Sequence, residues 1–312
     1  MGKMATDRSQ SALVDEFLRD EMARSNRALR SLAPVVSHLL ETHGPSLVSD
    51  AIVARLRGML SHIAEQLIEH FLGGLSGAPS AVQTGLGERL LNDAPLVNHL
   101  YSLALEGFLT EGLARRASID PVLSPLLQEL IASEQPEIAE LAMSVLAAQS
   151  RFIQSQSRME IALAELPHEL FANAVSHIEA LETALTQSEF VDAEKKLKQG
   201  IDEAESRIAL LARLATSMQG GAVAALALDH AGLALFASSA ASLTRQTRER
   251  VVFACHEGQT VRLALTLKAA GLSSSAIAGQ IALLGGHTVL PSSFDTMAQS
   301  HAIDALREMS AV

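Results

Sequence analysis

Three groups of residues carry side chains suited to chemistry, and the first is Cys255-His256-Glu257. A thiol beside an imidazole suggests a nucleophile with its base. A Cys–His catalytic pair, however, is brought together by the fold and not by adjacency in the sequence. Neighbouring residues on a helix also point about 100° apart. We therefore predict that Cys255 is a small buried side chain and that the chain has no catalytic residue.

The second group consists of two histidines and two glutamates on one predicted helix: His62, Glu65, Glu69 and His70. Their spacing places most of them on a shared face. Di-iron helical bundles need a Glu-x-x-His motif on each of two helices. The one such spacing in this chain, Glu165 to His168, contains Pro167. No His-Glu-x-x-His motif is present either. We therefore predict a solvated helix edge, no metal site and no cofactor.

The third group is Asp229-His230, at the centre of the almost uncharged stretch from Gly220 to Leu243. That stretch is long enough to span a membrane, but a central aspartate costs about 2.5–3.5 kcal/mol on insertion. We expect a buried helix or helix pair, broken at Gly232, and no integral membrane segment. A buried acid and imidazole there would form a ligand site, so Asp229 and His230 are the candidate ligand-binding residues. The alternative is that the pair caps a helix end or faces a turn.

The elements that must position these groups are predicted from the central stretch, Gln135 to Leu170. Apolar residues recur there every three or four positions, and Ser150-Arg151 interrupts them before Pro167 ends the pattern. The spacing predicts two short helices, each with one apolar face, with Leu141 and Val145 in the core. Because such helices are not stable alone, we predict an all-α fold, an array of antiparallel helix pairs that is HEAT-like or an irregular helical bundle.

Glycine and proline divide the rest of the chain into similar helical segments. We predict a disordered tail over residues 1–9, an N-terminal helical region over 10–120 and a helical-repeat region over 121–312. Within the last region, residues 189–218 are rich in charge and read as one long helix. The spacing of the helices is irregular, which favours a helical array over a regular repeat.

Composition restricts the classes of function. Aromatic residues make up 3% of the chain and the formal net charge is −11. An acidic protein is a poor ligand for nucleic acid, which usually binds a basic face. The single cysteine fits a reducing cytoplasm. The chain also has no phosphate-binding loop and no Gly-x-Ser-x-Gly elbow, so we predict that it is not an enzyme.

A resemblance to a known family rests on three features of the central stretch: Glu137–Leu146, the break at Ser150-Arg151-Phe152 and the closing Leu166-Pro167. These resemble an alphaproteobacterial family of unknown function with HEAT-like helical repeats, over about a third of the chain. The resemblance implies a bacterial helical-repeat protein. It transfers no catalytic residue.

Two functions are compatible with these patterns. The first is a non-enzymatic helical scaffold or regulatory protein-interaction module, because helical arrays form extended concave surfaces. Its protein partner is unknown, and self-association would give a homodimer most readily. The alternative is a small-molecule-binding regulator with a cavity between helices near Asp229 and His230.

Overall fold

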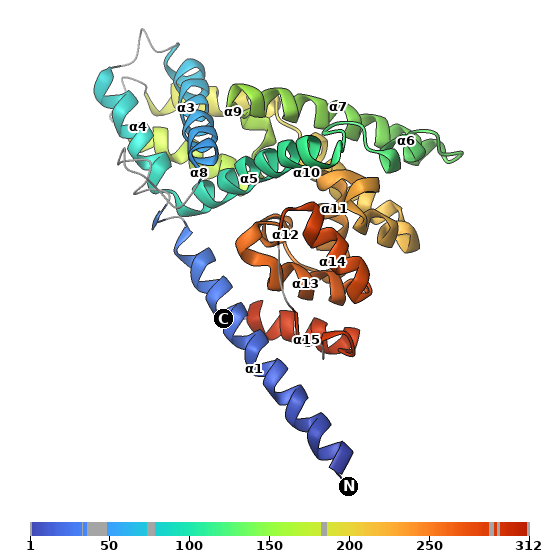
Figure 1. Cartoon of the computed structure of the whole chain (residues 1–312). Coiled ribbons are helices and arrows are strands. Elements are labelled where there is room, and N and C mark those ends of the chain that lie inside the picture. The colour runs from blue at the N-terminus through green and yellow to red at the C-terminus, as the bar shows by residue number, and fades with distance from the viewer. Residues whose placement is uncertain are drawn as a thin grey trace. The chain divides into compact units, whose positions relative to one another are not determined.

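The structure is a computed structural model that describes residues 2–32, 34–35, 49–73, 79–181, 186–286, 290–291 and 294–310. Helix makes up 81% of it, and the described residues contain no strand (Figure 1). The predicted all-α fold is therefore confirmed. Within the same ranges, no helix combines the length and the apolar character that crossing a membrane requires.

The chain divides into two compact units, each built from separate segments. Unit 1 contains residues 1–31, 109–142 and 212–312, and unit 2 contains residues 32–108 and 143–211. Three of the four boundaries fall within helices: α5 (Ala94–Ala117), α7 (Pro136–Arg158) and α10 (Arg207–Ser217). This differs from the predicted regions 10–120 and 121–312, because segments distant in sequence complete each core.

Unit 2 is organised around α3 (Asp50–Leu72), against which α4 (Ser80–Asn92), α8 (His168–Glu179) and α9 (Gln187–Gln199) pack (Figure 1). Buried apolar side chains recur along α3 every three or four residues, as on any helix with one face in a core: Ile52, Leu56, Met59, Ile63, Leu67 and Phe71. Phe71 stacks on Phe190 of α9 with ring centroids 4.7 Å apart. Aromatic stacking thus fixes α9 beside α3.

Helix α7 is continuous from Pro136 to Arg158, so the predicted break at Ser150-Arg151 is wrong. Arg151 is exposed and Ser150 half-buried, and polar residues on an outward face do not interrupt a helix. Val145 is buried as expected, but Leu141 is only half-buried. The neighbouring Ala142 is fully buried, so the buried face of α7 passes through Ala142 and not through Leu141. After α7, an extended connection containing the 3₁₀ turn η1 (Leu163–Glu165) leads to α8.

The predicted long charged helix over 189–218 is also wrong: α9 ends at Gln199, and α10 begins at Arg207 after the 3₁₀ turn η2 (Glu203–Glu205). The Asp202 carboxylate accepts a hydrogen bond from the Ala204 N–H at 3.0 Å and so starts η2. Aspartate at such a position competes with continued helix. The charged residues 189–205 therefore belong to the helix α9 and to the turn η2 that follows it, and not to one long helix.

Unit 1 has α13 (Thr260–Ala269) at its centre, with every residue from Val261 to Ala269 buried. Around it pack α1 (Gly2–Arg30), α12 (Arg248–Ala254), α14 (Ser274–Leu283) and α15 (Gln299–Ser310). Helix α1 begins at Gly2, so residues 2–9 are helical and not the predicted disordered tail. Lys3, Met4, Ala5 and Arg8 in this segment favour helix.

The remaining elements of unit 1 are α6 (Pro125–Ile131), η3 (Gln219–Leu226), α11 (Leu228–Thr244) and η4 (Glu257–Gln259). Helix α11 is interrupted at Gly232, whose φ of 68° and ψ of 164° are not helical. A left-handed φ favours glycine because it lacks a Cβ. The predicted break at Gly232 is thus confirmed, and most of α11 beyond it is buried.

Candidate functional site

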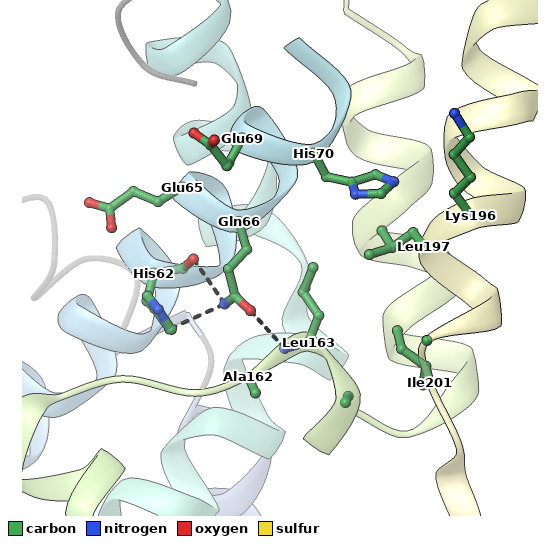
Figure 2. A pocket seen from close by; sticks show the side chains of 12 residues that line it. His62, Glu65, Gln66, Glu69, His70, Ala162, Leu163, Lys196, Leu197 and Ile201 are labelled. Carbon is green, nitrogen blue, oxygen red and sulfur yellow. Dashed lines mark hydrogen bonds between the residues drawn. The ribbon is translucent and has the colours of Figure 1, made fainter. Parts of the chain in front are cut away.

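A pocket of about 910 Å³ opens in unit 2 between α3, the connection after α7, and the end of α9 (Figure 2). We call it the α3–α9 groove. Its lining comes from three segments: His62, Glu65, Gln66, Glu69 and His70 of α3; Ala162, Leu163 and Ala164 of the connection; and Lys196, Leu197, Gly200 and Ile201 of α9 and the residues after it.

The floor of the groove is an extended backbone segment held to α3 by two side chains. The Gln66 amide donates to the Ile161 carbonyl oxygen (2.8 Å) and accepts from the Leu163 N–H (3.1 Å). His62 Nδ1 lies 2.7 Å from the same Ile161 oxygen and 3.2 Å from the Ile161 backbone nitrogen. Backbone outside a helix needs such partners. These contacts therefore fix the connection against α3, and Figure 2 shows the one between Gln66 and Leu163.

The second wall is α9, which a capping box begins. The Thr186 side chain accepts from the Glu189 N–H, and the Glu189 carboxylate accepts from the Thr186 N–H and hydroxyl. These hydrogen bonds to Thr186 lower the pKa of Glu189. Further along, His70 of α3 donates from Nε2 to the Ala193 carbonyl oxygen at 2.8 Å. The capping box thus begins α9, and the His70 contact holds α9 beside α3.

The rims of the groove carry opposite charge. Glu65 and Glu69 are exposed on α3, where Figure 2 shows them extending to the side away from α9. Lys196 is exposed on α9 across the groove. Between the rims lie apolar side chains from the connection and from α9, namely Leu163, Leu197 and Ile201. The surface is therefore an apolar strip with an acidic rim on one side and a basic residue on the other.

The second group of the sequence analysis thus lines one groove, although its members have different roles. Glu65 and Glu69 are solvated, as predicted for a helix edge, whereas His62 and His70 hold neighbouring backbone. No three His, Cys, Asp or Glu residues of the described chain are grouped so that they could hold a metal ion. The sequence could indicate the shared face but not the groove, since α9 and the connection come from more than 90 residues later.

Asp229 and His230 lie in the first turn of α11, and the expectation that the acid is buried is wrong. Asp229 is exposed, and His230 Nε2 is 3.4 Å from a carboxylate oxygen of the exposed Glu129. Because α11 begins at Leu228, the pair falls at its surface end, where an acid interacts well with the helix dipole. Neither residue lines the α3–α9 groove.

Cys255 is buried, with 1% of its surface exposed, as predicted for a small apolar side chain. The adjacent imidazole has a structural partner, because His256 Nδ1 accepts a hydrogen bond from the Gly258 N–H at 3.1 Å. This contact caps η4. The first group therefore consists of a buried thiol and a capping histidine.

We expect unit 1 to lose stability as the pH falls below about 6.5, the ordinary pKa of histidine. Desolvation lowers the pKa of His256, partly opposed by Glu257. The folded state then binds fewer protons than the unfolded state, so stability is complete above pH 6.5 and declines as the pH falls through the lowered pKa. His256→Asn retains an acceptor for the cap without titrating. Urea unfolding at several pH values measures the free energy of unfolding, which should fall less steeply with decreasing pH in this variant than in the natural protein. Equal slopes in the two proteins would show that His256 does not cause the loss of stability.

Sequence reasoning missed a buried ion pair in unit 2. Arg207, 2% exposed, donates from both terminal nitrogens to the two oxygens of Glu106, each at 2.8 Å. One of these nitrogens also donates to Gln149 Oε1 at 3.0 Å, and the guanidinium carbon lies 3.6 Å from the Phe152 ring centroid. A lone glutamate within the apolar run 103–109 was the available signal. It indicates a buried charge but not its partner.

Comparison with known proteins returned no match: no protein-family model, no curated protein and no solved structure corresponds to the chain. The resemblance to HEAT-like repeat proteins therefore stays a prediction.

Proposed function

We propose that this protein is a non-enzymatic interaction module whose unit 2 binds a segment of a partner protein in the α3–α9 groove. The observation that carries the proposal is the apolar strip between oppositely charged rims. Leu197 and Ile201, which are half-buried, supply contact area for an apolar anchor. Such anchors dominate binding energy at interfaces. The fitting segment has an apolar residue between a basic residue, facing Glu65 and Glu69, and an acidic residue, facing Lys196.

The size and form of the groove support a chain segment as the occupant. Its volume of about 910 Å³ is near the upper end of the range for small-molecule sites, roughly 300–1,000 Å³. Sites for small molecules are, however, usually enclosed, whereas this groove carries solvated charges along its edges. A peptide with several side chains uses such a surface more completely.

The alternative, a small-molecule regulator with its site at Asp229 and His230, has less support because Asp229 is exposed. Three further proposals, on location, partner class and lineage, rest on the sequence. We propose a cytoplasmic location from the single cysteine and no binding of nucleic acid from the negative net charge. The resemblance favours a bacterial helical-repeat protein. We also propose that the protein could form a homodimer, in which a second copy of the chain would occupy the groove.

Charge reversal in the groove should change which peptides the protein selects. From a random-peptide display library, the natural protein should enrich peptides with a basic and an acidic residue flanking an apolar one. The variant Glu65→Lys/Glu69→Lys should bind a selected peptide roughly tenfold more weakly at low salt, a loss of about 1.4 kcal/mol. Fluorescence anisotropy measures the affinity, and the difference should shrink as salt screens the charges.

Glu88→Lys is the matched control, because Glu88 is an exposed glutamate on α4 that does not line the groove. It should leave the affinity unchanged, and Lys196→Glu should shift selection away from acidic residues. Enriched peptides without this charge pattern, or an equal loss in the Glu88→Lys variant, would refute the assignment of the groove.

A further inference from the structure

We propose that the segment which occupies the α3–α9 groove is Arg158-Met159-Glu160 of a second copy of this chain. These residues, here called the 158–160 corner, join the end of α7 to the connection that forms the floor of the groove. Two copies exchange their corners about a two-fold axis, so that each corner lies in the groove of the other copy. The inference rests on the function proposed for the groove and names the occupant.

The corner carries its side chains in the order that the groove selects. Arg158 is basic, Met159 is apolar and Glu160 is acidic. A segment that faces the acidic rim, the apolar strip and Lys196 in turn needs this order. Neither the Arg158 nor the Glu160 side chain forms an ion pair or a hydrogen bond with any residue that the structure describes. Both charges are therefore available to a second molecule.

The corner is also accessible on the surface of unit 2. Met159 is 41% exposed, Arg158 is exposed and Glu160 is half-buried. The φ of Met159 is 60°, a left-handed conformation that turns the backbone where a helix ends. Methionine suits a contact surface because its flexible side chain adapts to the shape of a partner. A second copy can therefore contact the corner without any rearrangement of the fold.

The corner cannot enter the groove of its own chain. A Cβ at Gly58 of α3 would lie 2.5 Å from the Met159 Cβ, so the corner is packed against α3 at this glycine. The connection then follows α3 past His62 to Gln66, which both hold it by side-chain contacts. Corner and groove thus occupy successive positions along one helix, and both are fixed there. Only the corner of another copy can fill the groove.

A two-fold axis level with His62 brings each corner to the groove of the other copy. Gly58 marks the corner, and Gln66 lies within the groove lining. Each is about 6 Å from His62 along the helix axis, in opposite directions. When two α3 helices lie antiparallel across this axis, Gly58 of one copy is opposite Gln66 of the other. The same contact then forms twice, which is the property of an isologous dimer.

The dimer should be weak, because each copy contributes one apolar side chain and two charges to the groove of the other. Small interfaces are typical of weak, transient complexes. We therefore expect a dissociation constant of roughly 100 µM. Protein at a few micromolar is then monomeric, and its groove stays open to other peptides with the same charge pattern.

Sedimentation equilibrium of the full chain, at concentrations below and above this value, tests the inference. The variant Arg158→Glu brings an acidic corner to the acidic rim, and Glu65→Lys/Glu69→Lys brings a basic rim to the basic corner. Each variant alone should dimerise about tenfold more weakly than the natural protein, because like charges then meet at both contacts. An equimolar mixture of the two should dimerise as well as the natural protein, since both exchanged contacts then join opposite charges.

Arg89→Glu is the matched control, because Arg89 is exposed on α4 and does not line the groove. It should leave the dissociation constant unchanged, and circular dichroism checks that every variant is folded. A natural protein that stays monomeric well above the expected dissociation constant, while selected peptides still bind the groove, would overturn this inference and leave the proposed function standing. A monomer whose groove binds no selected peptide would remove both. A dimer that Arg158→Glu does not weaken, or that the mixture does not restore, would show that the copies meet through another surface.

Discussion

Replacing Arg207 with Met should lower the free energy of unfolding by about 3–5 kcal/mol, the cost of leaving a buried charge without its partner. The affected partner is Glu106, whose side chain is 0% exposed and whose two oxygens both accept from the guanidinium. Without Arg207, this carboxylate has lost both charged hydrogen bonds in a site that water does not reach. Gln149 also loses its donor.

The double variant Arg207→Met/Glu106→Leu separates this cause from a simple loss of packing. Replacing both members of a buried pair with apolar residues is often neutral or stabilising. The double variant should therefore recover most of the stability that the single variant loses. A control, Arg158→Met, changes an exposed arginine at the end of α7 and should stay within about 0.5 kcal/mol of the natural protein.

Urea unfolding followed by circular dichroism gives the free energy of unfolding of the three variants. Because the chain has two units, the transition of unit 2 must be fitted separately where two steps are seen. An Arg207→Met variant within 1 kcal/mol of the natural protein, judged against the expected 3–5 kcal/mol, would show that the pair is not buried as described. A double variant as unstable as the single one would show that packing, and not charge, is responsible.

Apolar spacing was sufficient to predict the all-α fold, because it reports local burial on one face. The break in α11 was predictable in the same way, since Gly232 interrupts an otherwise uniform apolar stretch. The interpretation failed where polar residues were taken as breaks. Ser150 and Arg151 lie within α7, whereas the charged stretch around Asp202 does end a helix. Whether a polar residue ends a helix depends on the hydrogen bonds and tertiary contacts of its side chain. The spacing of apolar residues carries no information on those contacts.

The groove was less predictable than the fold. It depends on the connection after α7, which meets α3 through contacts between residues 95 to 99 positions apart. The sequence identified His62, Glu65, Glu69 and His70 as a shared face but could not indicate what lies opposite. Gln66, which holds the floor, was not among the candidates, because a glutamine on a helix has no distinctive spacing. Asp229 and His230 were selected because they lie within an apolar stretch of the sequence. In the structure they lie in the first turn of α11, where Asp229 is exposed.

The close approach of α3 and the end of α7 leads to the second prediction: Gly58→Val should destabilise unit 2 by roughly 3 kcal/mol, the upper part of the range for overpacking. A Cβ at Gly58 would lie 2.5 Å from the Met159 Cβ and 2.6 Å from the Met159 carbonyl oxygen. The second contact is with backbone, which cannot move aside without displacing the connection. That displacement would carry Ile161 and Leu163 away from His62 and Gln66, so peptide affinity in the groove should fall as well.

The direction in which Gly58→Ala changes the free energy of unfolding tests this argument most sharply. Alanine is favoured over glycine within a helix by about 1 kcal/mol, and at Gly87 of α4 a Cβ would meet nothing within 4 Å. Gly87→Ala should therefore stabilise the protein, whereas Gly58→Ala should destabilise it despite the same gain in helix propensity. Met159 has a φ of 60°, a conformation that suits glycine, so adding Met159→Gly should relieve the Cβ contact and restore part of the loss. Urea midpoints for the four variants decide the matter: if Gly58→Ala is as stabilising as Gly87→Ala, the two helices do not approach at this position, and the floor of the groove is not held as described.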